Sequence, residues 1–199
     1  MSQGVDSILF KDLAAMDPMA VCARTDCDYD GESGQYLLEV WGGRLGIQPR
    51  EKSVVVLEPS ALPSGDYLTL LALHYLMKSS FRDPMERWIS EKDIPGGAAF
   101  FRGPHAIPTQ RITDAHGDDL DGFRARCGQL GGTPLDMADA AFAFEVLPRI
   151  PVAALYWAGD EDFPCQARLL FDKGIGHHLP LDIIFALAVL VCRTLGRAE

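Results

Sequence analysis

The final third of the chain carries the clearest hydrophobic pattern. Apolar segments predict three consecutive strands over residues 142–147, 152–157 and 167–171. The middle segment is apolar on both alternating faces, which carry Val152, Ala154 and Tyr156 on one side and Ala153, Leu155 and Trp157 on the other. A continuous apolar run between turn residues is typical of a strand that is covered on both sides. We therefore place residues 152–157 at the centre of a sheet.

A helix that begins near Pro180 closes this unit. Asp182 lies in its first turn, where a carboxylate suits the positive end of the helix dipole. The following residues leave almost no polar face: Ile183, Ile184, Phe185, Leu187, Val189, Leu190 and Val191. We expect such a helix to be buried within the domain or against a partner. Its apolar run over residues 183–192 is about half of the ~20 residues that span a bilayer.

The first part of the chain changes from a helical to a strand pattern. We predict an amphipathic helix over about residues 5–16, a short helix capped by Asp17 and an acidic loop over residues 26–34. The period then becomes two, which predicts a meander of two or three strands over residues 35–57. A hairpin turn is expected at Gly42 and Gly43.

Shorter patterns fill the middle of the chain. Ser64 is expected to cap a helix over residues 66–79, and Asp118 a later one. Residues 88–90 and 98–101 are expected to form short strands around a tight turn. No repeat or linker divides the sequence. The predicted fold is a single α+β domain over residues 1–199, with helices packed on a mixed, largely antiparallel sheet and a buried C-terminal helix.

Charge narrows the range of partners. The formal net charge is −10, and the sequence has no run of Lys and Arg. Nucleic acids and anionic membranes are therefore not expected as partners, because both attract basic surfaces. The N-terminus has no basic region followed by an apolar core, so we expect a cytoplasmic protein whose five cysteines are reduced.

Several short motifs resemble one protein family in order and spacing. They are Leu73-His74-Tyr75-Leu76, Trp88-Ile89-Ser90, Pro95-Gly96-Gly97, Tyr156-Trp157-x-Gly159-Asp160-Glu161-x-Phe163-Pro164, Leu170-Phe171-Asp172 and His178-Leu179-Pro180. The sequence resembles, over about residues 13–195, an uncharacterised bacterial and archaeal domain of unknown function that is common in anaerobes. Some members carry an extra iron–sulfur cluster domain. Nothing here matches that domain, since Cys22 and Cys27 have no third and fourth cysteine near them.

Three carboxylates form the first candidate site. Asp160, Glu161 and Asp162 follow a buried strand and offer oxygen ligands for a hard cation. The alternative is a solvated hairpin tip, and a hairpin places Asp172 at the opposite end from the three. The sequence predicts no metal site, because the spacing is not that of an EF-hand loop.

Histidines and tryptophans supply the other candidates. His74 is either a base or ligand on its helix or a partly buried residue with one hydrogen bond. His177 and His178 stand between two glycines and the start of the last helix, where a phosphate or carboxylate is attracted. The alternative is a plain glycine-rich loop. Trp88 and Trp157 either line an apolar pocket or belong to the core.

These observations leave three functions open. The first is an accessory module that binds a small ligand or a protein partner, which the family resemblance places in anaerobic redox or one-carbon metabolism. The second is an enzyme with a carboxylate/histidine site, with or without a metal, built from His74, Asp160, Glu161 and His178. The third is a homo-oligomeric assembly protein whose C-terminal helix pairs with another copy. The sequence assigns no catalytic residue and no cofactor.

Overall fold

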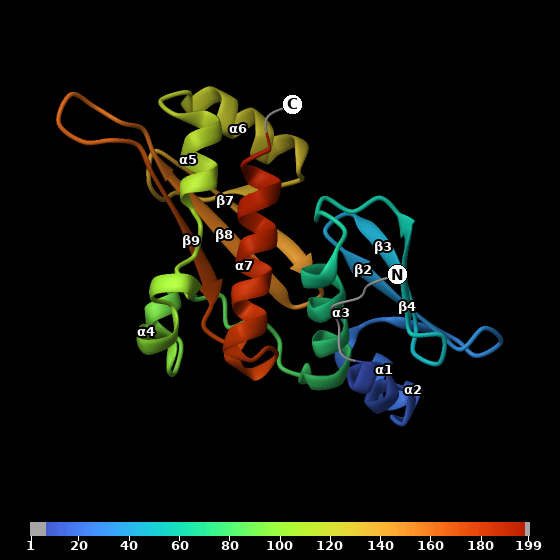
Figure 1. Cartoon of the computed structure of the whole chain (residues 1–199). Helices are drawn as coiled ribbons and strands as arrows, with labels where there is room; N and C mark the ends of the chain where they lie inside the picture. The colour runs from blue at the N-terminus through green and yellow to red at the C-terminus, as the bar shows by residue number, and fades with distance from the viewer. Residues whose placement is uncertain (1–6, 198–199) are drawn as a thin grey trace.

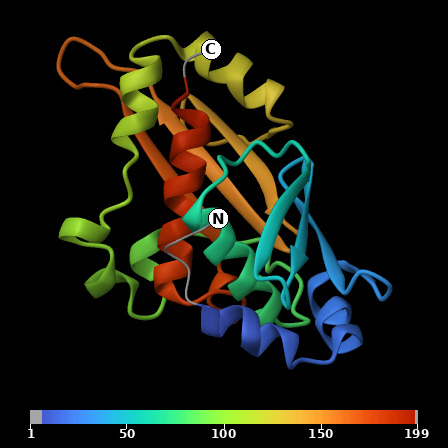
Figure 2. The same cartoon turned by 45° about the vertical axis from the view of Figure 1, so that its right-hand side comes forward.

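The strands of the protein are divided between two antiparallel sheets in the computed structural model, which describes residues 7–197. Sheet A follows chain order and contains β1 (Asp28–Asp30), β2 (Gln35–Val40), β3 (Gly43–Gln48) and β4 (Ser53–Glu58). Sheet B has the order β5-β9-β8-β7-β6, formed by β5 (Trp88–Ile89), β6 (Thr133–Pro134), β7 (Ala140–Leu147), β8 (Ile150–Trp157) and β9 (Gln166–Asp172). Figures 1 and 2 show the two sheets side by side.

The helices pack mainly on sheet B and between the sheets (Figure 1). They are α1 (Ser7–Ala14), α2 (Pro18–Thr25), α3 (Asp66–Lys78), α4 (Gly97–Phe100), α5 (Gln110–His116), α6 (Leu120–Gln129) and α7 (Leu181–Leu195). Single 3-10 turns occur at Glu91–Asp93, Gly103–His105 and Ile175–His177. None of the helices within residues 7–197 combines the length and apolar content that crossing a membrane requires. The predicted α+β class is confirmed.

The central position of β8 is confirmed. It lies between β7 and β9, and both of its faces are buried. Val152, Ala154 and Tyr156 belong to the main core, whereas Ala153 and Leu155 belong to a smaller cluster on the other face. Trp88, Trp157, Leu135 and Met137 cover that smaller cluster.

The burial of the C-terminal helix is also confirmed. In α7 only Asp182 and Arg193 are exposed, and the apolar residues from Ile183 to Leu195 are buried except for half-buried Phe185. The helix packs against sheet B and against α3 (Figures 1 and 2). Its apolar faces are therefore occupied by the protein's own core.

The structure corrects two predictions about secondary structure. Residues 98–100 belong to α4 and Phe101 is its C-cap, so this segment is not a strand. The chain turns tightly at buried Gly97, where a Cβ would lie 2.0 Å from the Glu91 carbonyl oxygen. Four apolar residues cannot distinguish a helical turn from a strand by periodicity. The predicted loop over residues 26–34 contains β1, which pairs with the start of β2.

Capping and turn residues also differ from the prediction. Gly65, not Ser64, is the N-cap of α3. Asp119, not Asp118, caps α6, since its carboxylate accepts a hydrogen bond from the Gly122 N–H at 2.8 Å. The hairpin between β2 and β3 turns at Trp41 and Gly42, one residue earlier than expected, and both have positive φ as in a type I′ turn.

Specific hydrogen bonds join sheet A to the rest of the molecule. The backbone N–H of Trp41 donates to the Val146 carbonyl at 3.0 Å. The Tyr75 hydroxyl lies 3.0 Å from the carbonyl oxygen of Thr25, which leads into sheet A, and 2.6 Å from that of Pro148, in the β7–β8 turn. The two sheets are thus fixed to one another through α3 and the Trp41 turn.

Candidate functional site

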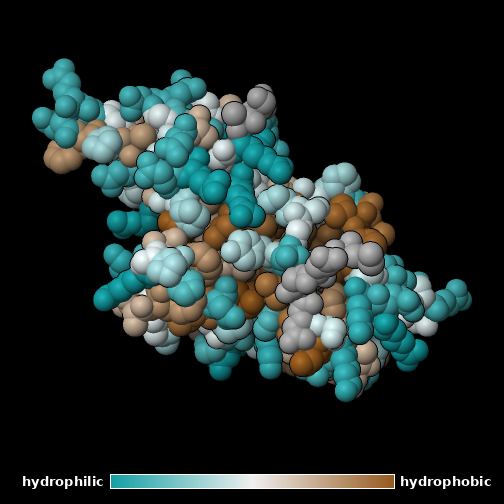
Figure 3. Space-filling view, in the orientation of Figure 1, coloured by the Kyte–Doolittle hydropathy of each residue, from teal (hydrophilic) through white to brown (hydrophobic). Residues whose placement is uncertain are grey.

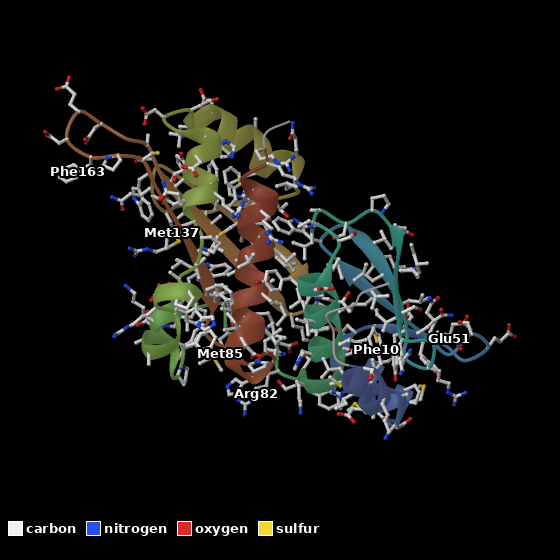
Figure 4. All side chains as sticks on the ribbon, viewed as in Figure 1. Phe10, Glu51, Arg82, Met85, Met137 and Phe163 are labelled. Carbon is white, nitrogen blue, oxygen red and sulfur yellow. The ribbon has the colours of Figure 1, made fainter. Side chains whose placement is uncertain are left out.

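Buried polar side chains gather where β9 ends and α7 begins. Ser79, Asp172 and His178 are all buried there, at 2–4% exposure. Exposed Arg82, Lys173 and His177 surround them. We call these six residues the α7 entry site: Ser79, Arg82, Asp172, Lys173, His177 and His178. Figure 4 shows Arg82 and Met85 beside the N-terminal end of α7.

Asp172 holds two segments of this site together. Its carboxylate accepts hydrogen bonds from the backbone N–H groups of Met85 at 3.0 Å, Arg87 at 3.4 Å and Gly174 at 2.7 Å. Three N–H donors satisfy a buried carboxylate, which would otherwise be costly to desolvate. Asp172 therefore anchors the segment over residues 79–87 to the loop between β9 and α7.

His178 makes a second link between the same segments. Its Nδ1 lies 2.9 Å from the Ser79 hydroxyl oxygen. Burial lowers the pKa of His178, and the neighbouring His177 and Arg149 lower it further, while Asp172 and a hydrogen bond to the Arg82 backbone raise it. The net direction favours the neutral imidazole. A buried and hydrogen-bonded ring is placed to hold the loop, not to touch a ligand from solvent.

His177, by contrast, faces an open pocket. The pocket has a volume of about 210 Å³ and is lined by Ile94, Pro95, Lys173, Gly176, His177, Leu179, Pro180 and Leu181. The ring Nε2 of His177 lies 3.3 Å from Nη1 of Arg82. The pocket therefore combines an apolar wall with cationic and imidazole groups at its rim.

The acidic turn lies at the other end of β9. Asp160 closes the tip of the β8–β9 hairpin, because its Oδ1 accepts hydrogen bonds from the N–H groups of Asp162 at 2.9 Å and Phe163 at 2.7 Å. Asp160, Glu161 and Asp162 are all exposed. The hairpin projects from the body of the molecule, with Phe163 at its tip (Figures 1 and 4). Residues 166–171 of β9 lie between this hairpin tip and Asp172, a length of about 20 Å.

His74 is half-buried on α3. Within residues 7–197, its Nδ1 has no hydrogen-bond partner. Burial lowers the pKa of His74, and nearby Lys78 also lowers it, whereas Asp182 at the start of α7 raises it. His74 is therefore near the first turn of α7, but it does not line the pocket that His177 faces.

The two tryptophans are part of a core cluster. Trp88 and Trp157 are half-buried and pack on the second face of sheet B. The Arg168 guanidinium lies 6.0 Å from the Trp157 ring centroid. Neither tryptophan lines the pocket at the start of α7.

The residues combined in the enzyme hypothesis do not converge. Asp160 and Glu161 are at the hairpin tip, whereas His178 is buried beyond the far end of β9. In the part of the chain that the structure describes, no group of three or more His, Cys, Asp or Glu side chains is arranged to hold a metal ion.

Sequence reasoning did not identify Lys173 and Arg82. Lys173 had a local signal, because it stands between β9 and the glycines that precede α7. Arg82 had none, since it reaches His177 from a segment 95 residues earlier in the chain.

Comparison with known proteins gives a family but no characterised relative. The model of a family described as a domain of unknown function (DUF3786) matches residues 17–194. Neither the curated proteins nor the solved structures include a significant match to the chain.

Proposed function

We propose that this chain, which belongs to the family described as a domain of unknown function (DUF3786), binds a small anionic ligand in the pocket at the start of α7. The ligand carries a carboxylate or a phosphate. The observation that carries the proposal is local charge. Although the protein has a net charge of −10, Lys173 and His177 line an apolar-walled pocket, and Arg82 lies 3.3 Å from the His177 ring.

The pocket offers three features that suit such a ligand. The positive end of the α7 dipole lies at Pro180 and Leu181, which line it. Lys173 and His177 supply hydrogen-bond donors for the anion. Ile94 and Leu179 give an apolar wall for a short carbon skeleton. The buried Asp172 charge is already held by three backbone N–H groups.

Nuclear magnetic resonance titration tests this proposal. The ¹⁵N-labelled protein is titrated with inorganic phosphate and, separately, with pyruvate, to distinguish the two anions. We expect saturable shifts of the Gly174, Gly176 and His177 amides with at least one of them. Lys173→Met and His177→Gln should each weaken binding about tenfold, equivalent to about 1.4 kcal/mol.

The matched control removes a lysine elsewhere. Lys11 is exposed on α1, so Lys11→Met changes the net charge equally without touching the pocket. Its affinity should equal that of the unchanged protein. Shifts that do not saturate, or an equal loss in Lys11→Met and Lys173→Met, would show that binding is non-specific. The setting in anaerobic redox or one-carbon metabolism rests on the family resemblance alone.

A second candidate function is self-association, and a specific surface favours it. It does not use α7, whose apolar residues are buried in the protein's own core. Strand β4 is the last strand of sheet A and pairs with β3. Its residues Val55, Val56 and Leu57 are 40%, 46% and 47% exposed. Figure 3 shows this apolar patch over β4.

The sequence of β4 is complementary to a second copy of itself. Antiparallel pairing of two β4 strands about Val55 places Lys52, just before the strand, opposite Glu58 of the other copy. Ser53 and the apolar residues 54–57 lie between them. Edge strands that remain monomeric usually carry a charge or proline within the strand. Residues 54–57 contain neither.

Sedimentation velocity over a range of protein concentrations tests this second function. A dimer is expected, and Val56→Lys should raise its dissociation constant at least tenfold, because it places a charge in the pairing edge. Met19→Lys is the matched control, since Met19 is 73% exposed on α2. A monomer at every concentration would reject self-association.

A further inference from the structure

Two cysteines lie in contact at the end of α2. The sulfur atoms of Cys22 and Cys27 are 3.3 Å apart. Cys22 is half-buried, and Cys27 is buried with 7% exposure. The Thr25 hydroxyl lies 3.2 Å from the Cys27 sulfur. Neither cysteine belongs to the α7 entry site or to sheet B.

The C-terminal cap of α2 brings the two sulfurs together. Asp26 caps the helix in the left-handed conformation, with φ 51°, and its N–H donates to the Cys22 carbonyl at 2.9 Å. Such a cap folds the chain back, so that the residue after it contacts the last turn of the helix. That residue is Cys27, and the helical residue it meets is Cys22. The contact is therefore built by local backbone geometry.

We infer that Cys22 and Cys27 form a reversible intramolecular disulfide. A disulfide has an S–S distance of about 2.05 Å, so closure requires the sulfurs to approach by about 1.3 Å. The cap already fixes the backbone on both sides, and Arg149 reinforces it through an ion pair of 2.8 Å with Asp26.

The reaction needs a two-electron oxidant, and a small-molecule disulfide supplies it. Cys22 is the more accessible sulfur. Burial raises the pKa of Cys27 to about 12, which keeps that thiol protonated. The Cys22 thiolate therefore attacks first, forming a mixed disulfide and releasing one thiolate of the oxidant. Cys27 then attacks the Cys22 sulfur, the mixed S–S bond breaks, and the second thiolate leaves with the Cys27 proton.

The pair is placed to sense redox state at the joint between the sheets. The carbonyl oxygen of Thr25, next to Asp26, lies 3.0 Å from the Tyr75 hydroxyl, which is also 2.6 Å from the carbonyl oxygen of Pro148 in the β7–β8 turn. Closing the disulfide restricts the cap from which Thr25 and Asp26 make these contacts.

Thiol trapping of the full-length protein tests this inference. Reduced protein is incubated with glutathione disulfide, quenched in acid, denatured and labelled with a maleimide. We expect the oxidised protein to take up two fewer maleimides than the reduced protein. Arg24 lies between the cysteines, so tryptic cleavage should leave two peptides joined only by the Cys22–Cys27 bond. Treatment with dithiothreitol should restore both labels.

Three variants decide the outcome. Cys22→Ser and Cys27→Ser should each abolish the loss of two labels, whereas Cys165→Ser, at a half-buried cysteine elsewhere, should retain it. A stable glutathione adduct on Cys22 without closure would overturn the inference. An oxidised protein whose disulfides join different molecules would also overturn it, and so would an unchanged label count. In both cases the contact between Cys22 and Cys27 would be only packing at a helix cap.

Discussion

Strands β4 and β8 have similar sequences and opposite environments. Both are apolar at successive positions, with Val54-Val55-Val56-Leu57 in β4 and Val152-Ala153-Ala154-Leu155 in β8. In β8 these side chains are at most 5% exposed, whereas Val55, Val56 and Leu57 in β4 are 40–47% exposed. A continuous apolar run therefore identifies a strand, but it does not say whether anything covers that strand.

The difference arises from position within the sheets. Strand β8 has a strand on each side, α7 on one face and the tryptophan cluster on the other. Strand β4 ends its sheet and follows a tight turn at Lys52, which has φ 49°. Sheet B thus has a central strand that is paired on both sides, whereas sheet A ends in a strand that pairs on one side only within residues 7–197.

Matched leucine substitutions give the largest expected contrast between the two sheets. Leu169→Ala, at a 1% exposed position in β9, should lower the free energy of unfolding by about 2–5 kcal/mol, because it leaves a cavity in the core. Leu57→Ala in β4 should lower it by less than about 0.5 kcal/mol. Urea denaturation at protein concentrations where the chain is monomeric measures both. Equal losses would show that β4 is covered in the monomer.

Removing one hydroxyl should loosen the joint between the sheets. Tyr75→Phe removes the hydroxyl whose single proton is shared between the Thr25 and Pro148 carbonyls. Since Tyr75 is fully buried, the loss should cost about 1–3 kcal/mol in free energy of unfolding. Tyr67→Phe on the same helix is the control, because Tyr67 is only half-buried. If the two variants lose the same stability, Tyr75 does not join the sheets.

The free energy of unfolding should depend on pH through His178, at the end of sheet B. This effect should be the smallest of the three. Burial lowers the pKa of His178 below its ordinary value of 6.5, so the unfolded chain binds a proton more readily than the folded one. This contribution to stability is complete above pH about 6.5 and is lost as the pH falls towards the folded pKa. The free energy of unfolding should change by at most about 1.4 kcal/mol per pH unit.

Urea denaturation at pH about 7.5 and about 5.5 measures this slope. His178→Gln should be less stable at both values, since it disturbs the Ser79 contact, but should lose less stability on acidification. His74→Gln should act in the same direction, because burial also lowers the pKa of His74. His105→Gln is the control, at an exposed position. If His178→Gln leaves the change in free energy of unfolding with pH unaltered, His178 is not the source of the pH dependence.

The candidate site was predictable only in part. His177 and the glycines before α7 are adjacent in sequence, so their proximity to the helix start could be inferred. The separation of Asp172 from the acidic turn also followed from the hairpin. The burial of His178 could not be inferred, because it depends on Ser79, which is 99 residues away. The contribution of Arg82 depends in the same way on a distant loop.

The sequence by itself determined the elements whose pattern is long and periodic. These are the three strands of the final third, the α3 helix and the largely apolar α7, because local hydrophobic order directly reflects which faces are buried. Only the tertiary structure decided the division into two sheets, the exposure of β4 and the helical state of residues 97–100. These features depend on contacts between segments that are far apart in the sequence. The free energy of such contacts cannot be inferred from a local hydrophobic pattern.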